Sequence, residues 1–217
     1  MKSISFLSVW ILFFIFQTIH TSAKSKPNII YLMLDEWGYF ESGHMGSTDL
    51  ITPNIDQFAS EGMRFTNAYA GAPVCGPTRC SLLTGLHAGN MSMRVNNGHS
   101  PIRADEPTLA SILKTKRYAT GGFGKWGIGG RGTTGVPEKH GFDLFFGYYD
   151  QVHAHTFYPS YLIRNSEEVP LPGNSGTSFY EGKTHAQLEI FKESIAFIQK
   201  HKDEPCFCYL PWTPPHG

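Results

Sequence analysis

Blocks of apolar and polar positions along the chain predict strands and helices in turn. A continuous apolar run at 29–34 stops abruptly at two carboxylates. Such a run is typical of a strand in a parallel sheet, buried on both faces. Further strands are expected at 63–70, which alternates in part, at about 118–123 and at 205–212.

Three segments between these strands predict amphipathic helices. The first begins at Thr52 and Pro53 and ends near Gly62, the second lies around 109–113, and the third spans about 184–201. The faces expected to be buried are Ile55, Phe58 and Ala59 in the first helix, Leu109, Ile112 and Leu113 in the second, and Leu188, Phe191, Ile195 and Ile198 in the third.

Alternating strands and helices indicate an α/β fold with a mostly parallel sheet and helices on both faces. One stretch, 127–182, is rich in Gly, Pro, His and Tyr and has little periodicity. We expect it to form a long loop-rich insertion on one rim of the sheet, where substrate contacts would lie.

The N-terminus has the three-part pattern of a secretory signal peptide. Lys2 supplies positive charge, 4–19 is largely apolar, and 21–23 offers small residues for cleavage after Ala23. A membrane anchor is the alternative, but the apolar run is short for the roughly 20 residues of a spanning helix. We therefore expect a periplasmic or secreted protein, with no stable membrane insertion after cleavage and a mature part at 24–217.

Composition limits the classes of function. The 217 residues are 41% hydrophobic and carry 18 basic and 18 acidic side chains, which excludes a disordered tail and a nucleic-acid binder that relies on bulk positive charge. After export, a pair among Cys75, Cys80, Cys206 and Cys208 could form a disulfide, although their spacing does not demand one. Cys206 and Cys208 would face one way on a strand and suit a core.

Two groups of residues carry candidate chemistry. Asp35 and Glu36 follow the first strand, where they are either a solvated acidic turn or ligands for a hard divalent cation. Cys75 lies at the predicted N-terminus of a helix that contains Pro77, and Arg79 follows one turn later. Helix amides and a guanidinium favour a thiolate or a tetrahedral oxyanion there. A buried cysteine beside a structural arginine is the alternative, and the spacing is too short for a cysteine-dependent phosphatase loop.

These residues resemble the type I sulfatases of the alkaline phosphatase superfamily. The signature is Cys75-x-Pro77-x-Arg79 followed by Leu83-Thr84-Gly85. Similar segments, in the same order and spacing, are Pro27-Asn28-Ile29-Ile30 leading to Asp35, Thr52-Pro53-Asn54-Ile55-Asp56, Arg64-Phe65-Thr66-Asn67-Ala68-Tyr69 and Gly124-Lys125-Trp126. The resemblance covers nearly the whole mature chain and implies that the chain is the N-terminal portion of such a catalytic domain.

The resemblance also implies roles for individual residues. A formylglycine-generating enzyme would oxidise Cys75 to Cα-formylglycine, whose hydrate is the nucleophile, beside a Ca²⁺ ion held by Asp35, Glu36 and the modified Cys75. Arg79 would steady the formylglycine oxygens and Lys125 would clamp the sulfate. The histidine after the last strand, His216, would contact the sulfate or protonate the leaving oxygen.

The sequence departs from the family pattern at three points. Glu36 stands where many sulfatases have Asp, and Gly127 stands where many have a histidine two residues after the lysine. The base that releases sulfate is therefore unassigned; His153 and His155 are candidate substitutes and substrate-binding residues if 152–155 is extended. The family's later calcium ligands and a second active-site lysine would lie beyond the last residue of the sequence.

Together these features predict an enzyme that hydrolyses sulfate monoesters, either aryl sulfates or sulfated carbohydrates. A phosphonate or phosphate monoester hydrolase of the same superfamily is the second possibility, because sulfate and phosphate esters share a tetrahedral geometry. An inactive fragment is the third.

Overall fold

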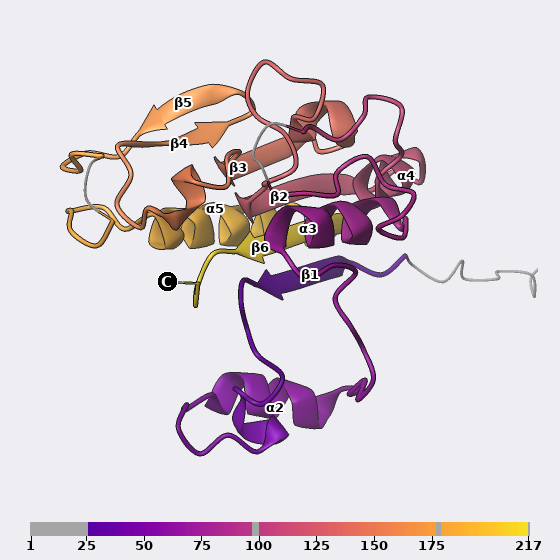
Figure 1. Cartoon of the computed structure of the whole chain (residues 1–217), viewed down its shortest axis with the longest axis vertical. Coiled ribbons are helices and arrows are strands. Elements are labelled where there is room, and N and C mark those ends of the chain that lie inside the picture. Colours follow the sequence, from indigo (N-terminus) through magenta and orange to yellow (C-terminus); the bar gives the residue numbers. More distant parts are fainter. Residues whose placement is uncertain (1–25, 97–99, 177–178, 217) are drawn as a thin grey trace, which may run out of the picture.

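The computed structural model describes residues 26–96, 100–176 and 179–216 (Figure 1). The expected signal peptide, 1–23, lies outside the described residues. The elements are β1 (Ile29–Leu34), η1 (Gly43–Met45), α2 (Pro53–Glu61), α3 (Cys75–Thr84), α4 (Leu109–Thr115), β2 (Ala119–Lys125), η2 (Pro137–His140), β3 (Leu144–Tyr148), η3 (His153–His155), β4 (Tyr161–Arg164), β5 (Glu167–Pro170), α5 (Ala186–Lys200) and β6 (Cys206–Trp212), where η denotes a 3₁₀ helix. Within these ranges, no helix is both long and apolar enough to cross a lipid bilayer.

The strands form one sheet in the order β1-β6-β2-β3-β4-β5. The first four are parallel, and β4 and β5 add an antiparallel hairpin at one edge. Gly124 and Gly147 face each other across β2 and β3, with positive φ angles of 142° and 153°. A Cβ at position 147 would lie 2.0 Å from the Gly124 carbonyl oxygen, so only glycine fits this close approach.

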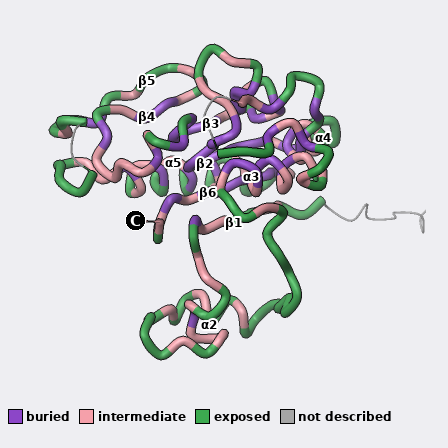
Figure 2. The backbone as a smooth tube through the Cα atoms, viewed as in Figure 1, coloured by how far each residue is buried: buried purple, intermediate pink, exposed green. Residues whose placement is uncertain are grey.

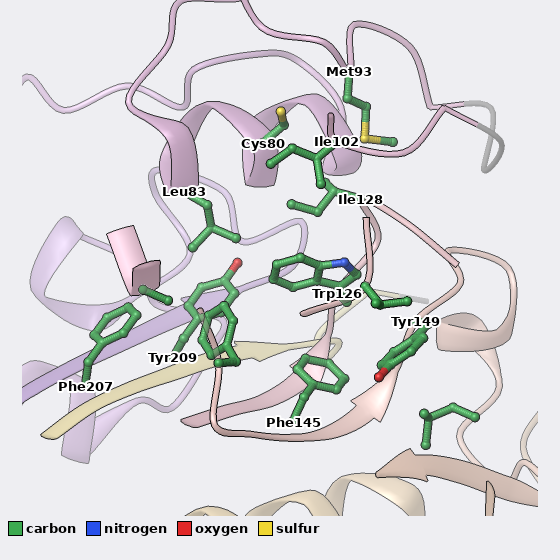
Figure 3. Packing of buried hydrophobic residues seen from close by; sticks show 14 of the residues in the cluster. Cys80, Leu83, Met93, Ile102, Trp126, Ile128, Phe145, Tyr149, Phe207 and Tyr209 are labelled. Carbon is green, nitrogen blue, oxygen red and sulfur yellow. The ribbon is translucent and has the colours of Figure 1, made fainter. Parts of the chain in front are cut away.

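A hydrophobic core covers each face of the sheet, as the alternation along β6 requires. Phe207 and Tyr209 face the layer of α3 and α4, where Figure 3 shows Leu83 and Trp126 packed around Tyr209. The other face packs against α5 and contains Cys206, Cys208 and Leu210. All four cysteines of the chain are free thiols, and the pair on β6 faces one way into the core, as expected.

The prediction of a mostly parallel sheet with helices on both faces is confirmed. The strand at 29–34 forms, but the expectation that both of its faces are buried is wrong: Ile30 is 53% exposed and Leu32 48%. The reason is that β1 is the edge strand of the described sheet and pairs with β6 alone. The helix after Thr52 also forms, but α2 lies apart from the sheet with no buried residue, and Phe58 is 80% exposed (Figures 1 and 2).

Two other segments differ from their predictions. The segment 63–70 is not a strand; no neighbouring backbone pairs with it, and Met63, Phe65 and Tyr69 are exposed. The stretch 127–182 is not merely a loop-rich insertion, because it contains three strands of the sheet, including β3 beside β2. The strand β3 was missed because its aromatic and glycine-rich sequence does not alternate between apolar and polar residues. The strand is buried along most of its length, so no such alternation is needed.

The helix α5 forms close to the predicted bounds, but most of its buried face was wrongly predicted. Of the four expected residues, Ile198 packs against the core, while Leu188, Phe191 and Ile195 are exposed to 60%, 46% and 36%. Ile190 and Phe197 are buried against the sheet instead. The helix carries apolar residues on two sides, so periodicity alone did not identify the side that contacts the sheet.

Two matched substitutions can test which side of α5 packs against the sheet. Ile190→Ala removes a side chain that is 0% exposed and should cost about 2–5 kcal/mol of unfolding free energy. Ile195→Ala makes the same chemical change at the half-exposed face and should cost less than about 1 kcal/mol. Urea denaturation of both variants measures the difference, and equal losses would contradict the described orientation.

Candidate active site

Four of the predicted site residues converge at one edge of the sheet. Asp35 follows β1, Lys125 ends β2, and His216 lies four residues after β6, so three parallel strands deliver side chains to their shared carboxyl edge. Cys75 is the first residue of α3, as predicted. The helix starts there because Val74 is extended and Pro77 suits its first turn, and it ends at Gly85 in the left-handed conformation.

A buried carboxylate joins two buried cations at the centre of this edge. The Asp35 Oδ2 accepts from Lys125 Nζ at 2.7 Å, and its Oδ1 lies 3.2 Å from Arg79 Nη2. Arg79 Nη1 also donates to the Lys125 carbonyl oxygen at 2.6 Å. Arg79 and Lys125 are both 0% exposed and Asp35 is 4% exposed. The Arg79 and Lys125 side chains are therefore fixed in position from two sides.

This cluster carries more positive than negative charge. Burial by itself raises the pKa of Asp35, but Arg79 and Lys125 outweigh it and hold that pKa below its ordinary value. One carboxylate thus faces two buried cations, and the N-terminus of α3 adds its positive dipole end. The surplus positive charge, together with donor hydrogens from both cations, suits an anionic ligand beside Cys75.

A cleft of about 480 Å³ opens above the cluster. Cys75 is partly exposed in it, and Asp35, His155 and His216 share its lining. The Cys75 sulfur, an Asp35 oxygen and a His216 ring nitrogen lie within 4.8 Å of one another. The cleft therefore gives a ligand access to Cys75 while the cations below it stay out of water.

Asp35 and Glu36 fit only part of a calcium site. Their oxygen donors are the type that Ca²⁺ prefers, and Glu36 lies at the rim, with His216 Nε2 3.2 Å from its Oε1. Ca²⁺ takes about six to eight oxygen ligands. Two carboxylates supply fewer, and Asp35 already pairs with two cations.

The two histidines at 153 and 155 differ in position. The segment is a 3₁₀ helix, not extended chain, so the rings do not lie on one side. His155 enters the cleft, where its Nε2 lies 3.3 Å from Lys125 Nζ and its ring stacks on His216 at 4.2 Å. His153 packs instead between Tyr148 and Tyr161, with ring centroids 5.1 and 4.6 Å away.

Two polar residues of the site were not identified from the sequence. Asn96 lines the cleft, and its Oδ1 accepts from the Gly76 backbone amide at 3.3 Å, near the start of α3. Gln151 is buried and its Nε2 donates to the Gly127 carbonyl oxygen at 2.9 Å. Each is a single amide in an aperiodic segment, so no local pattern distinguishes it from a loop residue.

The central carboxylate provides a test of this geometry. Asp35→Asn keeps the shape but leaves Arg79 and Lys125 buried without an anion, and should cost about 3–5 kcal/mol of unfolding free energy. Asp105→Asn changes a carboxylate whose side chain is 89% exposed and should stay within about 0.5 kcal/mol of the parent protein. Chemical denaturation at neutral pH gives both values, and a small loss for Asp35→Asn would contradict the buried cluster.

The same carboxylate should make stability depend on acid. Because the folded pKa of Asp35 is lowered, its contribution is complete above the ordinary value of 3.8 and is lost as the pH falls through the folded pKa. Denaturation midpoints measured across this acid range should fall less steeply for Asp35→Asn than for the parent protein. An equal decline in stability with falling pH in both proteins would contradict the lowered pKa of Asp35.

Comparisons with known proteins identify the family of the chain. The sulfatase family model matches residues 27–217. The chain is 40% identical over 141 residues to human arylsulfatase D, covering 58% of this chain and 24% of that protein. It is 30% identical over 197 residues to the ulvan-active sulfatase of Formosa agariphila, covering 88% of this chain and 36% of that protein.

Solved structures extend the similarity to the fold. The crystal structure of Ps i-CgsB in complex with k-i-k-neocarrahexaose matches with a TM-score of 0.77 and 28% identity, over 89% of this chain and 46% of that one. The phosphonate monoester hydrolase of Agrobacterium radiobacter matches at 0.61 and 22% identity, over 88% of this chain and 42% of that one, which shows a shared fold alone. The chain thus spans 24% to 46% of the length of these proteins. On the family match over most of its length, the chain belongs to the sulfatase family.

Proposed function

We propose that the protein hydrolyses sulfate monoesters, with residue 75 as the nucleophile. The observation that carries the proposal is the position of Cys75: it opens α3 and shares a cleft with Asp35, the carboxylate that pairs with the buried Arg79 and Lys125. A sulfate ester carries a tetrahedral anionic group, and the cluster offers surplus positive charge within reach of the same cleft.

The two buried cations would have separate tasks. Arg79 presents a rigid guanidinium one turn after Cys75 and would orient the oxygens on residue 75. Lys125 comes from the end of β2, contacts the other carboxylate oxygen of Asp35, and would bind the sulfate oxygens. Because the protein holds both groups in place before substrate arrives, no reorganisation is needed when charge develops at the sulfate.

Residue 75 acts in this proposal as Cα-formylglycine, formed from Cys75 by a formylglycine-generating enzyme. Its hydrate has two hydroxyl groups, one to attack sulfur and one to restore the aldehyde when sulfate leaves. His216 would give a proton to the leaving oxygen, because it lines the cleft beside Cys75 and its Nε2 lies 3.2 Å from the Glu36 carboxylate. A Ca²⁺ ion, held in part by Asp35 and Glu36, would add positive charge at the diol and the sulfate.

The substrate class is proposed from the relatives. Arylsulfatase D is named for aryl sulfates, and the ulvan-active sulfatase is named for its activity on ulvan. A further neighbour, at a TM-score of 0.71 and 26% identity, was solved with its substrate D-glucosamine-2-N,6-O-disulfate. We therefore propose an aryl or carbohydrate sulfate as substrate, and an exported protein in which the N-terminal 23 residues are removed.

The test follows residue 75 through maturation. The full-length protein is co-expressed with a formylglycine-generating enzyme, and mass spectrometry of the peptide containing residue 75 should find the aldehyde in place of the thiol. Cys75→Ala should abolish turnover of 4-nitrophenyl sulfate, while Cys80→Ala, which changes a buried thiol of the same helix, should keep the aldehyde at position 75.

Two results would count against the proposal. An unmodified thiol in an active enzyme would remove the nucleophile. Preferred turnover of 4-nitrophenyl phosphate over the sulfate would support instead a phosphate or phosphonate ester hydrolase, since both esters present a tetrahedral anion to the same cations.

A further inference from the structure

The space beside Gly127 is closed by another side chain. The residue has a φ of 73°, and a Cβ built there would lie 2.3 Å from Gln151 Nε2. Gln151 is buried and donates to the Gly127 carbonyl oxygen at 2.9 Å. A side chain at position 127 would therefore have to displace Gln151 from a backbone with positive φ, and the glycine present supplies no imidazole to the cleft.

The segment that closes this space brings in an imidazole of its own. Four residues after Gln151, His155 ends the 3₁₀ helix η3 and lines the cleft together with Cys75 and Asp35. Its ring lies against His216, with centroids 4.2 Å apart and an angle of 24° between the planes. The structure thus places two stacked imidazoles above the buried cations.

The hydrogen bond to Lys125 defines the state of the His155 ring. A lysine ammonium can only donate, so the His155 Nε2 at 3.3 Å must accept, and the ring proton lies on Nδ1. Partial burial, followed by the charges of Lys125 and His216, lowers the pKa of His155. The ring is therefore held neutral, and its unprotonated Nε2 is directed at Lys125.

His216 has a different partner. Its Nε2 lies 3.2 Å from a Glu36 oxygen at the rim of the cleft. The two stacked rings therefore contact different groups of the site, His155 the buried Lys125 ammonium and His216 the Glu36 carboxylate.

We propose that His155 is the catalytic base that releases sulfate from residue 75. The inference rests on the proposed function, in which sulfate becomes esterified to one of the two oxygens on the residue-75 carbon. Nε2 of His155 takes the proton of the remaining hydroxyl, the C=O bond forms, and the bond from carbon to the sulfate oxygen breaks. The products are the aldehyde, the sulfate dianion and a protonated His155, which returns its proton to water.

The test separates formation of the ester from its breakdown. Full-length His155→Ala, matured as above, is mixed with excess 4-nitrophenyl sulfate, quenched and digested, and the peptide containing residue 75 is weighed. We expect a rapid release of about one 4-nitrophenol per aldehyde, accumulation of the sulfated peptide, and steady turnover reduced about 10²–10⁴-fold. The control is His87→Ala, an exposed histidine outside the cleft, which should show neither change.

Outcomes that overturn the proposal are equally distinct. His155→Ala with turnover within twofold of the parent protein, or with slowed turnover and no sulfated peptide, would assign His155 another role. If the alanine variant does not fold, His155→Gln is read in the same way, since it keeps a polar side chain of similar length. Failure of the proposed function itself is seen separately, as a parent protein that lacks the aldehyde or does not cleave the sulfate ester.

Discussion

The site depends on one buried carboxylate. Asp35 pairs with Lys125 at 2.7 Å and with Arg79 at 3.2 Å, and all three side chains are almost fully buried. Two cations without an anion between them would repel each other and lose their hydration, so neither could stay in the interior. With Asp35 present, they remain close together and still carry a surplus of positive charge. Stability and anion binding therefore depend on the same carboxylate.

The fold explains why this carboxylate meets its partners. Parallel strands β1 and β2 are separated in the sheet by β6 alone, so Asp35 and Lys125 emerge at the same edge although they are 90 residues apart. The helix α3 then places Arg79 one turn after Cys75, so that Cys75 lines the cleft while Arg79 is buried beneath it. The strand β3 continues the sheet beside β2, and the 3₁₀ helix η3 that follows it brings His155 to Lys125.

Much of this could be predicted because the signals are local. The apolar run before Asp35, the proline at the start of α3 and the glycines before Lys125 each indicate an element and where it ends. Cys75 and Arg79 form a motif within five residues. Their convergence with Asp35 was implied by the resemblance to the sulfatases, and the structure brings the three residues together.

The rest depends on contacts that no short segment records. The burial of α5 depends on which of two apolar sides meets the sheet, and β1 is exposed because of its place at the edge. The position of His155 depends on a turn of 3₁₀ helix and on Gln151, which fills the space beside Gly127. From the sequence, His153 and His155 were equivalent, and their packing separates them.

A double-mutant cycle between Asp35 and Lys125 tests the central claim most directly. The unfolding free energies of the parent protein, Asp35→Asn, Lys125→Met and the double variant give the coupling between the two side chains. A buried ion pair predicts a coupling between about 0.5 and 3 kcal/mol, with the double variant less destabilised than the sum of the single ones. Additive losses, within about 0.3 kcal/mol, would contradict the account.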